Sequence, residues 1–248
     1  MRTSSRRSQK ARGRALEAVW RWLGRAPYAA TVAYQERLRA AILSGEGPET
    51  LLLCEHDPVI TLGRSANASN VLASPAELAR RGIAVERISR GGDVTIHLPG
   101  QLVGYPVVRL RRGVVDHMTA MSRALIAVLA ELGVEASWRR DAPGLWVAGA
   151  KICAFGVNVH RRVAIHGFAL NVAIDPGPFA LIVPCGLTGA RLTSIAEIAG
   201  AAPTLPTIAA RAAIALGSEL GVTFHSKIDR SARDPIAMRD WITKMIGA

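Results

Sequence analysis

The chain has 248 residues, which is enough to bury a sizeable core without disulfides or a structural metal, so one large domain is expected. It contains no run of 18 consecutive apolar residues, which excludes a membrane-spanning helix, and its three cysteines, an odd number, disfavour a disulfide framework. A reducing, cytoplasmic location is therefore expected. The formal charge of +12 attracts acidic partners, but charge alone does not choose between nucleic acid, anionic lipid and an acidic protein.

The first predicted segment is a basic disordered tail over residues 1–16, which carries six basic side chains and no acidic one. Its Arg- and Ser-rich composition also resembles a transit peptide, although Arg21 and Arg25 interrupt any apolar stretch that a secretion signal would need. Residues 17–248 are expected to form one domain. Its first elements are a helix over 28–43, strands over 51–54 and 59–62, and a short helix from Ser74-Pro75 to Gly82.

The remaining elements mix strands and helices without a regular strand–helix–strand alternation. Strands are predicted over 84–88, 94–96, 102–108, 145–147, 152–159 and 163–172, and helices over 114–132, 207–220 and 235–246. Residues 176–194 are rich in Pro, Gly and Thr and are predicted to be a long loop. The pattern favours an α+β (mixed α/β) fold, a single mixed β-sheet packed by helices, over a doubly wound nucleotide-binding fold.

Residues 90–101 form the densest stretch of polar residues and glycines. Paired glycines allow the backbone to approach a ligand closely, so this stretch is a candidate binding segment, although a hairpin with a tight turn is the commoner explanation. No Lys-Ser or Lys-Thr follows, which excludes a phosphate-binding P-loop. His97 within it is equally consistent with a structural histidine.

Three cysteines are candidates for a nucleophile. Cys54 lies in an apolar run and Cys153 lies within a strand pattern, where thiols are usually buried and inert. Cys185 lies in a turn-forming stretch, where exposure and nearby N–H groups are able to lower a thiol pKa from about 8.5. Lys151 opens an apolar strand and is able to stabilise a thiolate, but a solvated lysine at a strand end is commoner. Composition favours Cys185 over Cys153 without deciding between them.

Metal and nucleic-acid sites are both disfavoured. The six histidines show no HxH or HxxxH pair, and Cys185 has no neighbouring ligand. Paired arginines occur at 80–81, 111–112, 139–140 and 161–162, but aromatic residues make up only 5% of the chain and do not accompany them. A solvated basic face is the simpler interpretation of these arginines.

Five ordered motifs between Trp22 and Glu197 together resemble the lipoyl(octanoyl) transferase family, the octanoyltransferases of lipoate biosynthesis. The motifs are Glu55–Arg64, similar to Glu-His-x-Pro-x-x-Thr-x-Gly-Arg; Arg90–Gln101, similar to Arg-Gly-Gly-x-x-Thr-Tyr-His-Gly-Pro-Gly-Gln; Gly144–Val147 with Lys151-Ile152; His166–Asn171, similar to His-Gly-x-Ala-Leu-Asn; and Pro184-Cys185-Gly186 with Thr193-Ser194. Two positions depart from the family pattern, since Ile96 replaces a tyrosine and Leu98 replaces a glycine. We expect Leu98 to place a bulky side chain beside the pocket, so that its replacement by glycine would preserve or improve transfer.

The resemblance implies a biotin/lipoate protein ligase-like fold and transfer of an octanoyl group from octanoyl-acyl carrier protein to a lysine of a lipoyl domain. Cys185 matches the thiol that accepts the acyl group as a thioester, and Lys151 matches the lysine that lowers its pKa. The implied substrate-binding residues are Arg90, Gly91, Gly92, Asp93, Val94, Thr95, Ile96, His97, Ala154, Phe155, Gly156, Gly167, Phe168 and Ala169. No cofactor is implied.

The implied partners are octanoyl-acyl carrier protein, the lipoyl domains of 2-oxoacid dehydrogenase acyltransferase subunits and the glycine cleavage H protein, with no nucleic acid and no membrane. Carrier and lipoyl domains are typically acidic, so the basic charge of the chain would attract them. Two alternatives remain at this level. One is an ATP-dependent lipoate or biotin protein ligase, which would need no cysteine, and the other is a non-catalytic acyl- or carrier-binding module.

Overall fold

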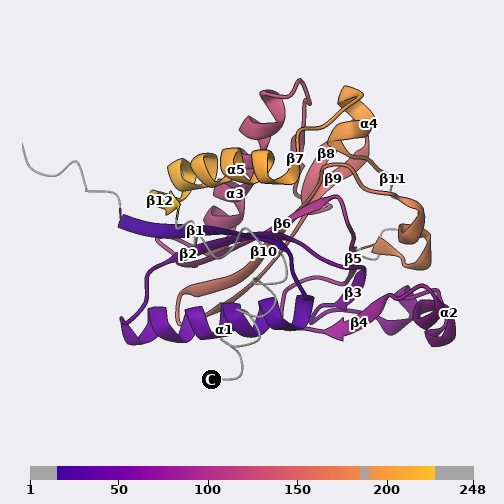
Figure 1. The fold of residues 1–248 in the computed structure, drawn as a ribbon, viewed down its shortest axis with the longest axis horizontal. Coiled ribbons are helices and arrows are strands. Elements are labelled where there is room, and N and C mark those ends of the chain that lie inside the picture. Colours follow the sequence, from indigo (N-terminus) through magenta and orange to yellow (C-terminus); the bar gives the residue numbers. More distant parts are fainter. Residues whose placement is uncertain (1–15, 185–188, 190, 227–248) are drawn as a thin grey trace, which may run out of the picture.

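A computed structural model describes residues 16–184, 189 and 191–226 (Figure 1). Its strands are β1 (Leu16–Arg25), β2 (Thr50–Glu55), β3 (Val59–Leu62), β4 (Ala84–Arg87), β5 (Val94–His97), β6 (Gln101–Arg109), β7 (Ser137–Arg139), β8 (Gly144–Val147), β9 (Ala150–His160), β10 (Val163–Asn171), β11 (Arg191–Leu192) and β12 (Val222–Ser226). Its helices are α1 (Tyr28–Ser44), α2 (Pro75–Arg80), α3 (Val114–Ala130), α4 (Ile195–Ala199) and α5 (Leu205–Leu220), with 3-10 turns η1 (Ala68–Asn70) and η2 (Gly177–Leu181).

The strands form one large mixed sheet and one small sheet. The large sheet has the order β12-β1-β2-β6-β10-β9-β8-β7, with β11 beside β9, and the small sheet has the order β4-β3-β5. Strand β1 runs parallel to both of its neighbours, whereas the pairs from β2 through to β7 are antiparallel. The mixture confirms the predicted mixed sheet and is unlike the all-parallel centre of a doubly wound fold.

Helices cover both faces of the large sheet. Helix α1 lies on one face, and α3 and α5 lie on the other (Figure 1). The continuous apolar run of β2 follows from this layering, because Leu51 and Leu53 pack in the core with α3 and α5 while Leu52 and Cys54 pack in the core beneath α1. A strand that is buried on both faces has no polar side to alternate with its apolar side.

Most predicted elements are confirmed to within a few residues, and Ser74 caps α2 with Pro75 at its first turn as expected. Strands β1, β7, β11 and β12 and helix α4 were not predicted. In β1, Arg21 and Arg25 obscure an alternation in which Trp20 and Trp22 pack against the main core. The predicted helix over 235–246 lies outside the described residues, and so does the tail except for Leu16, with which β1 begins. No helix of the described part is both long and apolar enough to cross a membrane.

A tight turn joins the small sheet to the large one. Gln101 N donates to Leu98 O (3.2 Å), with Pro99 and Gly100 between them, and Gly100 has φ +84°. These are the residue types of a type II turn, which needs a positive φ at its third position. A Cβ atom on Gly100 would lie only 2.1 Å from Ala173 O, so no other residue fits there without backbone movement.

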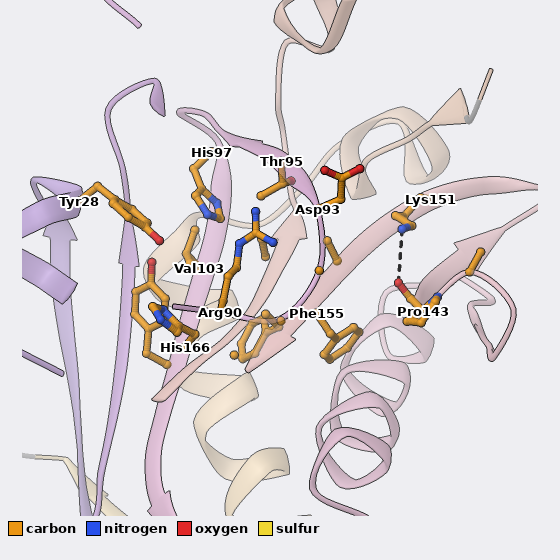
Figure 2. Close-up of a pocket in the computed structure, with 18 of the residues that line it drawn as sticks. Tyr28, Arg90, Asp93, Thr95, His97, Val103, Pro143, Lys151, Phe155 and His166 are labelled. Carbon is orange, nitrogen blue, oxygen red and sulfur yellow. Dashed lines mark hydrogen bonds between the residues drawn. The ribbon is translucent and has the colours of Figure 1, made fainter. Parts of the chain in front are cut away.

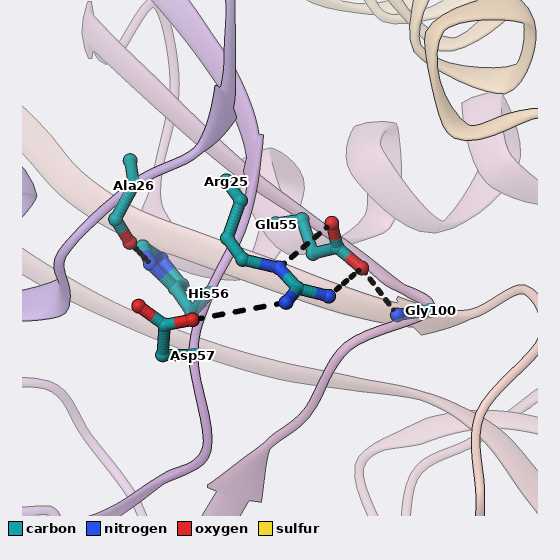
Figure 3. Close-up of polar contacts among 6 residues, drawn as sticks. All are labelled: Arg25, Ala26, Glu55, His56, Asp57 and Gly100. Carbon is teal, nitrogen blue, oxygen red and sulfur yellow. Dashed lines mark hydrogen bonds and ion pairs between the residues drawn. The ribbon is translucent and has the colours of Figure 1, made fainter. Parts of the chain in front are cut away.

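The same turn is held by the ends of β1 and β2 (Figure 3). Glu55 Oε1 accepts a hydrogen bond from Gly100 N (2.6 Å), and the Glu55 carboxylate also pairs with Arg25. His56 Nδ1 donates to Ala26 O (2.7 Å), which leaves His56 Nε2 to accept from the Tyr105 hydroxyl (2.8 Å). The first family-like motif of the sequence, Glu55–Arg64, therefore begins as an anchor for the segment that carries the site.

Candidate active site

A cavity of about 220 Å³ lies between the small sheet and the face of the large sheet that α1 also covers. It is bounded by the start of α1, the segment 90–97, strands β6, β9 and β10, and the turn between β7 and β8. Figure 2 shows Lys151 and Pro143 at one end of the cavity, Tyr28 and His166 at the other, and Phe155 between them. An elongated, largely apolar cavity with a few polar groups is typical of a small-molecule site.

Small residues on two neighbouring strands create the space. Ala154 of β9 pairs with Ala169 of β10, and Gly156 pairs with Gly167, and all four line the cavity. Phe155 and Phe168 add aromatic surface, with ring centroids 6.5 Å apart. These lining residues were all expected from the sequence as Ala154–Gly156 and Gly167–Ala169.

The segment 90–97 contributes only part of what was expected. Arg90, Gly92, Asp93, Thr95 and His97 line the cavity. Val94 and Ile96 do not, because β5 alternates and turns both side chains into the apolar core of the small sheet. Gly91 is also absent from the lining, and its N–H instead donates to Val157 O (3.0 Å), which ties the segment to β9. These three residues do not line the cavity, and their contact with substrate stays a prediction.

The expectation that the Leu98 side chain lies beside the pocket was wrong. Leu98 is 3% exposed and packs in the core of the small sheet with Ile60, Leu62 and Phe179 among others. It is not part of the cavity wall. Because it follows His97 in an alternating segment, its side chain points away from the side on which His97 faces the cavity.

Arg90 is a buried cation at the cavity wall. Its guanidinium donates to the carbonyl and the hydroxyl oxygen of Thr61 (both 2.8 Å) and to Gly91 O (3.1 Å). The contacts with Thr61 attach the 90–97 segment to β3, and the hydrogen bond from Gly91 N to Val157 O attaches it to β9. A Cβ atom on Gly156 would lie 3.1 Å from Arg90 Cδ, so the glycine on β9 permits this close packing.

The end of the cavity farther from Lys151 is aromatic and was not anticipated. Tyr28 stacks on His97 with ring centroids 5.5 Å apart, and Tyr105 and His166 complete this end. Burial lowers the pKa of His97 to about 3 and that of His166 to about 4, so both rings are neutral at pH 7. An apolar tail can therefore lie against uncharged rings. The sequence signal was weak, because tyrosines in a helix or strand pattern are normally core residues.

A chain of side-chain hydrogen bonds leads from the cavity to β11. His97 Nδ1 donates to Gln101 Oε1 (2.8 Å), Gln101 Nε2 donates to Asn171 Oδ1 (2.9 Å), and Asn171 Nδ2 donates to Thr193 O (3.0 Å). Thr193 N in turn donates to Lys151 O (3.0 Å). The family-like motifs at 90–101, 166–171 and 193–194 are therefore one connected network.

Lys151 is 4% exposed and lines the cavity, which rejects the alternative of a solvated lysine at a strand end. Its ammonium donates to Pro143 O (3.3 Å) and lies 5.1 Å from the centroid of the Trp146 ring. Cys185 lies outside the described residues, so its distance from Lys151 stays a prediction. Pro184, the residue before it, lines a second small cavity of about 20 Å³ together with Lys151.

The other two cysteines are buried. Desolvation raises the pKa of both the Cys54 and the Cys153 thiol well above the usual range, which disfavours a thiolate at either position. Among the described residues, no three His, Cys, Asp or Glu side chains are gathered as a metal ion would require.

Comparisons with known proteins show which family the chain belongs to. The Lipoyl protein ligase A/B catalytic domain family matches residues 27–216. Proteins named octanoyltransferase are similar to the chain: that of Syntrophotalea carbinolica is 42% identical over 192 residues, covering 76% of this chain and 88% of its own length, and that of Geobacter metallireducens is 46% identical over 181 residues, covering 72% and 82%.

The fold resembles solved lipoate ligases at low sequence identity. The structure of a lipoate-protein ligase A bound with ATP has a TM-score of 0.73 at 15% identity, with 94% of this chain and 97% of that chain covered. A bi-partite lipoate protein ligase from Thermoplasma acidophilum has a TM-score of 0.70 at 16% identity, with 94% of each chain covered. The predicted ligase-like fold is confirmed, and the chain belongs to the lipoyl protein ligase A/B catalytic domain family.

Proposed function

We propose that the protein is an octanoyltransferase that moves an octanoyl group from octanoyl-acyl carrier protein to a lysine of a lipoyl domain, in lipoate biosynthesis. The observation that carries the proposal is the elongated cavity with the buried Lys151 at one end, beside the segment that leads to Cys185. Relatives named octanoyltransferase support the substrate. The free, buried Cys54 and Cys153 are consistent with a reducing, cytoplasmic location.

The first step is an exchange of thioesters. The Cys185 thiolate attacks the octanoyl carbonyl carbon, a new C–S bond forms, and the C–S bond to the carrier breaks. The carrier leaves as a thiolate that then takes up a proton. The Lys151 ammonium favours the Cys185 thiolate before attack, since opposite charges stabilise each other in a site from which water is largely excluded.

The second step forms an amide. The amine of the acceptor lysine attacks the Cys185 thioester, a C–N bond forms, the C–S bond breaks, and the amine proton passes through Lys151 to the departing thiolate. Once Cys185 is acylated its negative charge is gone, so Lys151 loses its proton more readily and is able to act as a base. The small residues Ala154 and Gly167 let the backbone lie close to the developing oxyanion.

The partners follow from the same proposal. The T. acidophilum structure pairs a lipoate protein ligase with its E2 lipoyl domain, which supports a lipoyl domain as acceptor in this family. Octanoyl-acyl carrier protein as donor, and the lipoyl domains of 2-oxoacid dehydrogenases and the glycine cleavage H protein as acceptors, complete the proposal. Acidic carriers and a chain of formal charge +12 attract each other, so encounter rates should fall with added salt.

An ATP-dependent ligase is the alternative with a specific observation behind it, since the fold matches a ligase bound with ATP. A ligase activates the free acid as an adenylate, whereas thioester to amide transfer is downhill and needs no activation. Comparing octanoyl-carrier without ATP against octanoate with ATP separates the two reactions. Transfer that occurs only with octanoate and ATP would reject the octanoyltransferase proposal.

Intact-mass spectrometry tests the covalent step. The wild-type protein mixed with octanoyl-acyl carrier protein should gain one octanoyl mass, whereas Cys185→Ser should gain none, and Cys153→Ser, the matched control, should still be acylated. An unchanged mass for the wild type would leave the ATP-dependent ligase or a binding role. Lys151→Met should slow both acylation and transfer by about 10²- to 10⁴-fold, the usual contribution of a positioned acid–base group.

A further inference from the structure

The Trp146 ring lies close to the Lys151 ammonium but outside the cavity wall, and it has no part in the chemistry above. The Trp146 side chain is 5% exposed on β8, between the strands that carry Arg139 and Lys151. Arg139 Cζ lies 4.8 Å from the ring centroid and Lys151 Nζ lies 5.1 Å from it. Both distances are within the range of a cation–π contact, for which tryptophan is the best partner.

We propose that Trp146 is a positioning residue for Lys151, holding its ammonium at the cavity by a cation–π contact while the turn between β7 and β8 holds the ring. The inference deepens the proposed function and rests on it. A lysine side chain has four rotatable bonds, and its hydrogen bond of 3.3 Å to Pro143 O and its contact with the Trp146 ring both restrict where the ammonium lies. The ring supplies a broad apolar and electron-rich surface along which that chain is confined.

The turn between β7 and β8 positions both groups that contact the Lys151 ammonium, the Trp146 ring and the Pro143 carbonyl. Trp146 Nε1 donates to Ala142 O (2.9 Å), and Pro143, the next residue, supplies the carbonyl that accepts from Lys151. Arg139 pairs with Asp141 through its Nε (3.2 Å) and its Nη2, which closes the turn from the other side. One short segment therefore fixes the ring and the carbonyl relative to each other.

The packing around the lysine stem is tight as well. A Cβ atom on Gly144 would lie 2.9 Å from Lys151 Cε and 2.7 Å from Cys153 O. The glycine between Pro143 and the tryptophan strand thus leaves room for the lysine and little else. A purely structural role for Trp146 does not explain why these contacts all meet at the Lys151 ammonium.

The test measures the pH dependence of Cys185 alkylation by iodoacetamide, followed by intact mass, because only the thiolate reacts. Lys151→Met sets the reference for a thiol without its ammonium. Trp146→Leu should raise the alkylation midpoint by about one pH unit, which is a tenfold loss of thiolate at a given pH. Trp146→Phe keeps an aromatic face and should fall between Trp146→Leu and the wild type.

Trp138→Leu is the matched control, since Trp138 stands on β7 and packs edge-on against Phe155. It should leave the midpoint unchanged. Thermal unfolding of each variant separates lost folding from lost positioning, and if Trp146→Leu does not fold, Trp146→Phe carries the test. A wild-type midpoint in a folded Trp146 variant overturns the inference. An unchanged midpoint in Lys151→Met overturns the Lys151–Cys185 pairing itself, and with it the basis for this role.

Discussion

Replacing Leu98 with alanine separates a core role from a pocket role. The side chain is 3% exposed in the apolar core of the small sheet. Loss of its buried surface together with the cavity left behind should lower the free energy of unfolding by about 2–4 kcal/mol. Leu98→Gly should lower it by roughly a further 0.5–1 kcal/mol, because glycine has more freedom in the unfolded chain. The initial expectation that glycine would improve transfer is replaced by this one.

Urea denaturation followed by tryptophan fluorescence measures the loss, and Leu72→Ala is the matched control. Leu72 is 61% exposed, so its truncation should change stability by no more than about 0.5 kcal/mol. Transfer from hexanoyl, octanoyl and decanoyl carriers, measured well below the unfolding midpoint, should keep the wild-type preference in Leu98→Ala. A variant with wild-type stability and an altered chain-length preference would refute the reasoning and restore Leu98 to the pocket.

Three further predictions concern the turn, the cavity and pH. Gly100→Ala should destabilise by more than about 1 kcal/mol in urea titrations, because it meets both a positive φ and the Ala173 carbonyl; an unchanged midpoint would contradict this. Ala169→Leu should fill the cavity and lower the rate of octanoyl transfer relative to hexanoyl transfer at unchanged stability, and an equal loss for both donors would argue against an acyl site here. Burial lowers the pKa of His56 to about 4 and that of His97 to about 3, below the ordinary 6.5. Between pH 6.5 and these lowered pKa values the unfolded chain therefore binds more protons than the folded protein does. Stability should therefore be complete above pH 6.5 and fall as pH drops toward 4, by up to about 1.4 kcal/mol per unit for each histidine, whereas urea midpoints that do not change between pH 7 and 5 would exclude it.

Local signals were enough for most of the fold. Ser74 followed by Pro75 predicted the start of a helix because capping and a preset φ act within one turn. Strand β1 was missed because its partners, β2 and β12, are distant in the sequence, and only pairing with them explains why Arg21 lies within a strand. Pairing over long separations leaves no mark on a local pattern.

The site was predictable in part for the same reason. A motif matches consecutive residues, but a strand turns only alternate ones to a cavity, so Thr95 and His97 line it whereas Val94 and Ile96 pack in the core of the small sheet. Tyr105 was missed because a tyrosine within an apolar strand has the same pattern whether it faces a core or a cavity. Only the tertiary arrangement distinguishes the two.

The paired small residues on β9 and β10 limit the length of acyl chain that the cavity holds. This limit is adjustable at the alanine pair and rigid at the glycine pair. A Cβ atom on Gly167 would lie 2.3 Å from Gly104 O, so no side chain fits there unless the backbone moves. A Cβ atom on Gly156 would lie 3.1 Å from Gly91 O, so a side chain there would require the backbone to shift by a few tenths of an ångström. Ala154 and Ala169 already carry Cβ atoms and face open space. Variants that accept only shorter acyl chains should therefore arise by enlarging the alanine pair, whereas the glycine pair should resist change in evolution and in engineering alike.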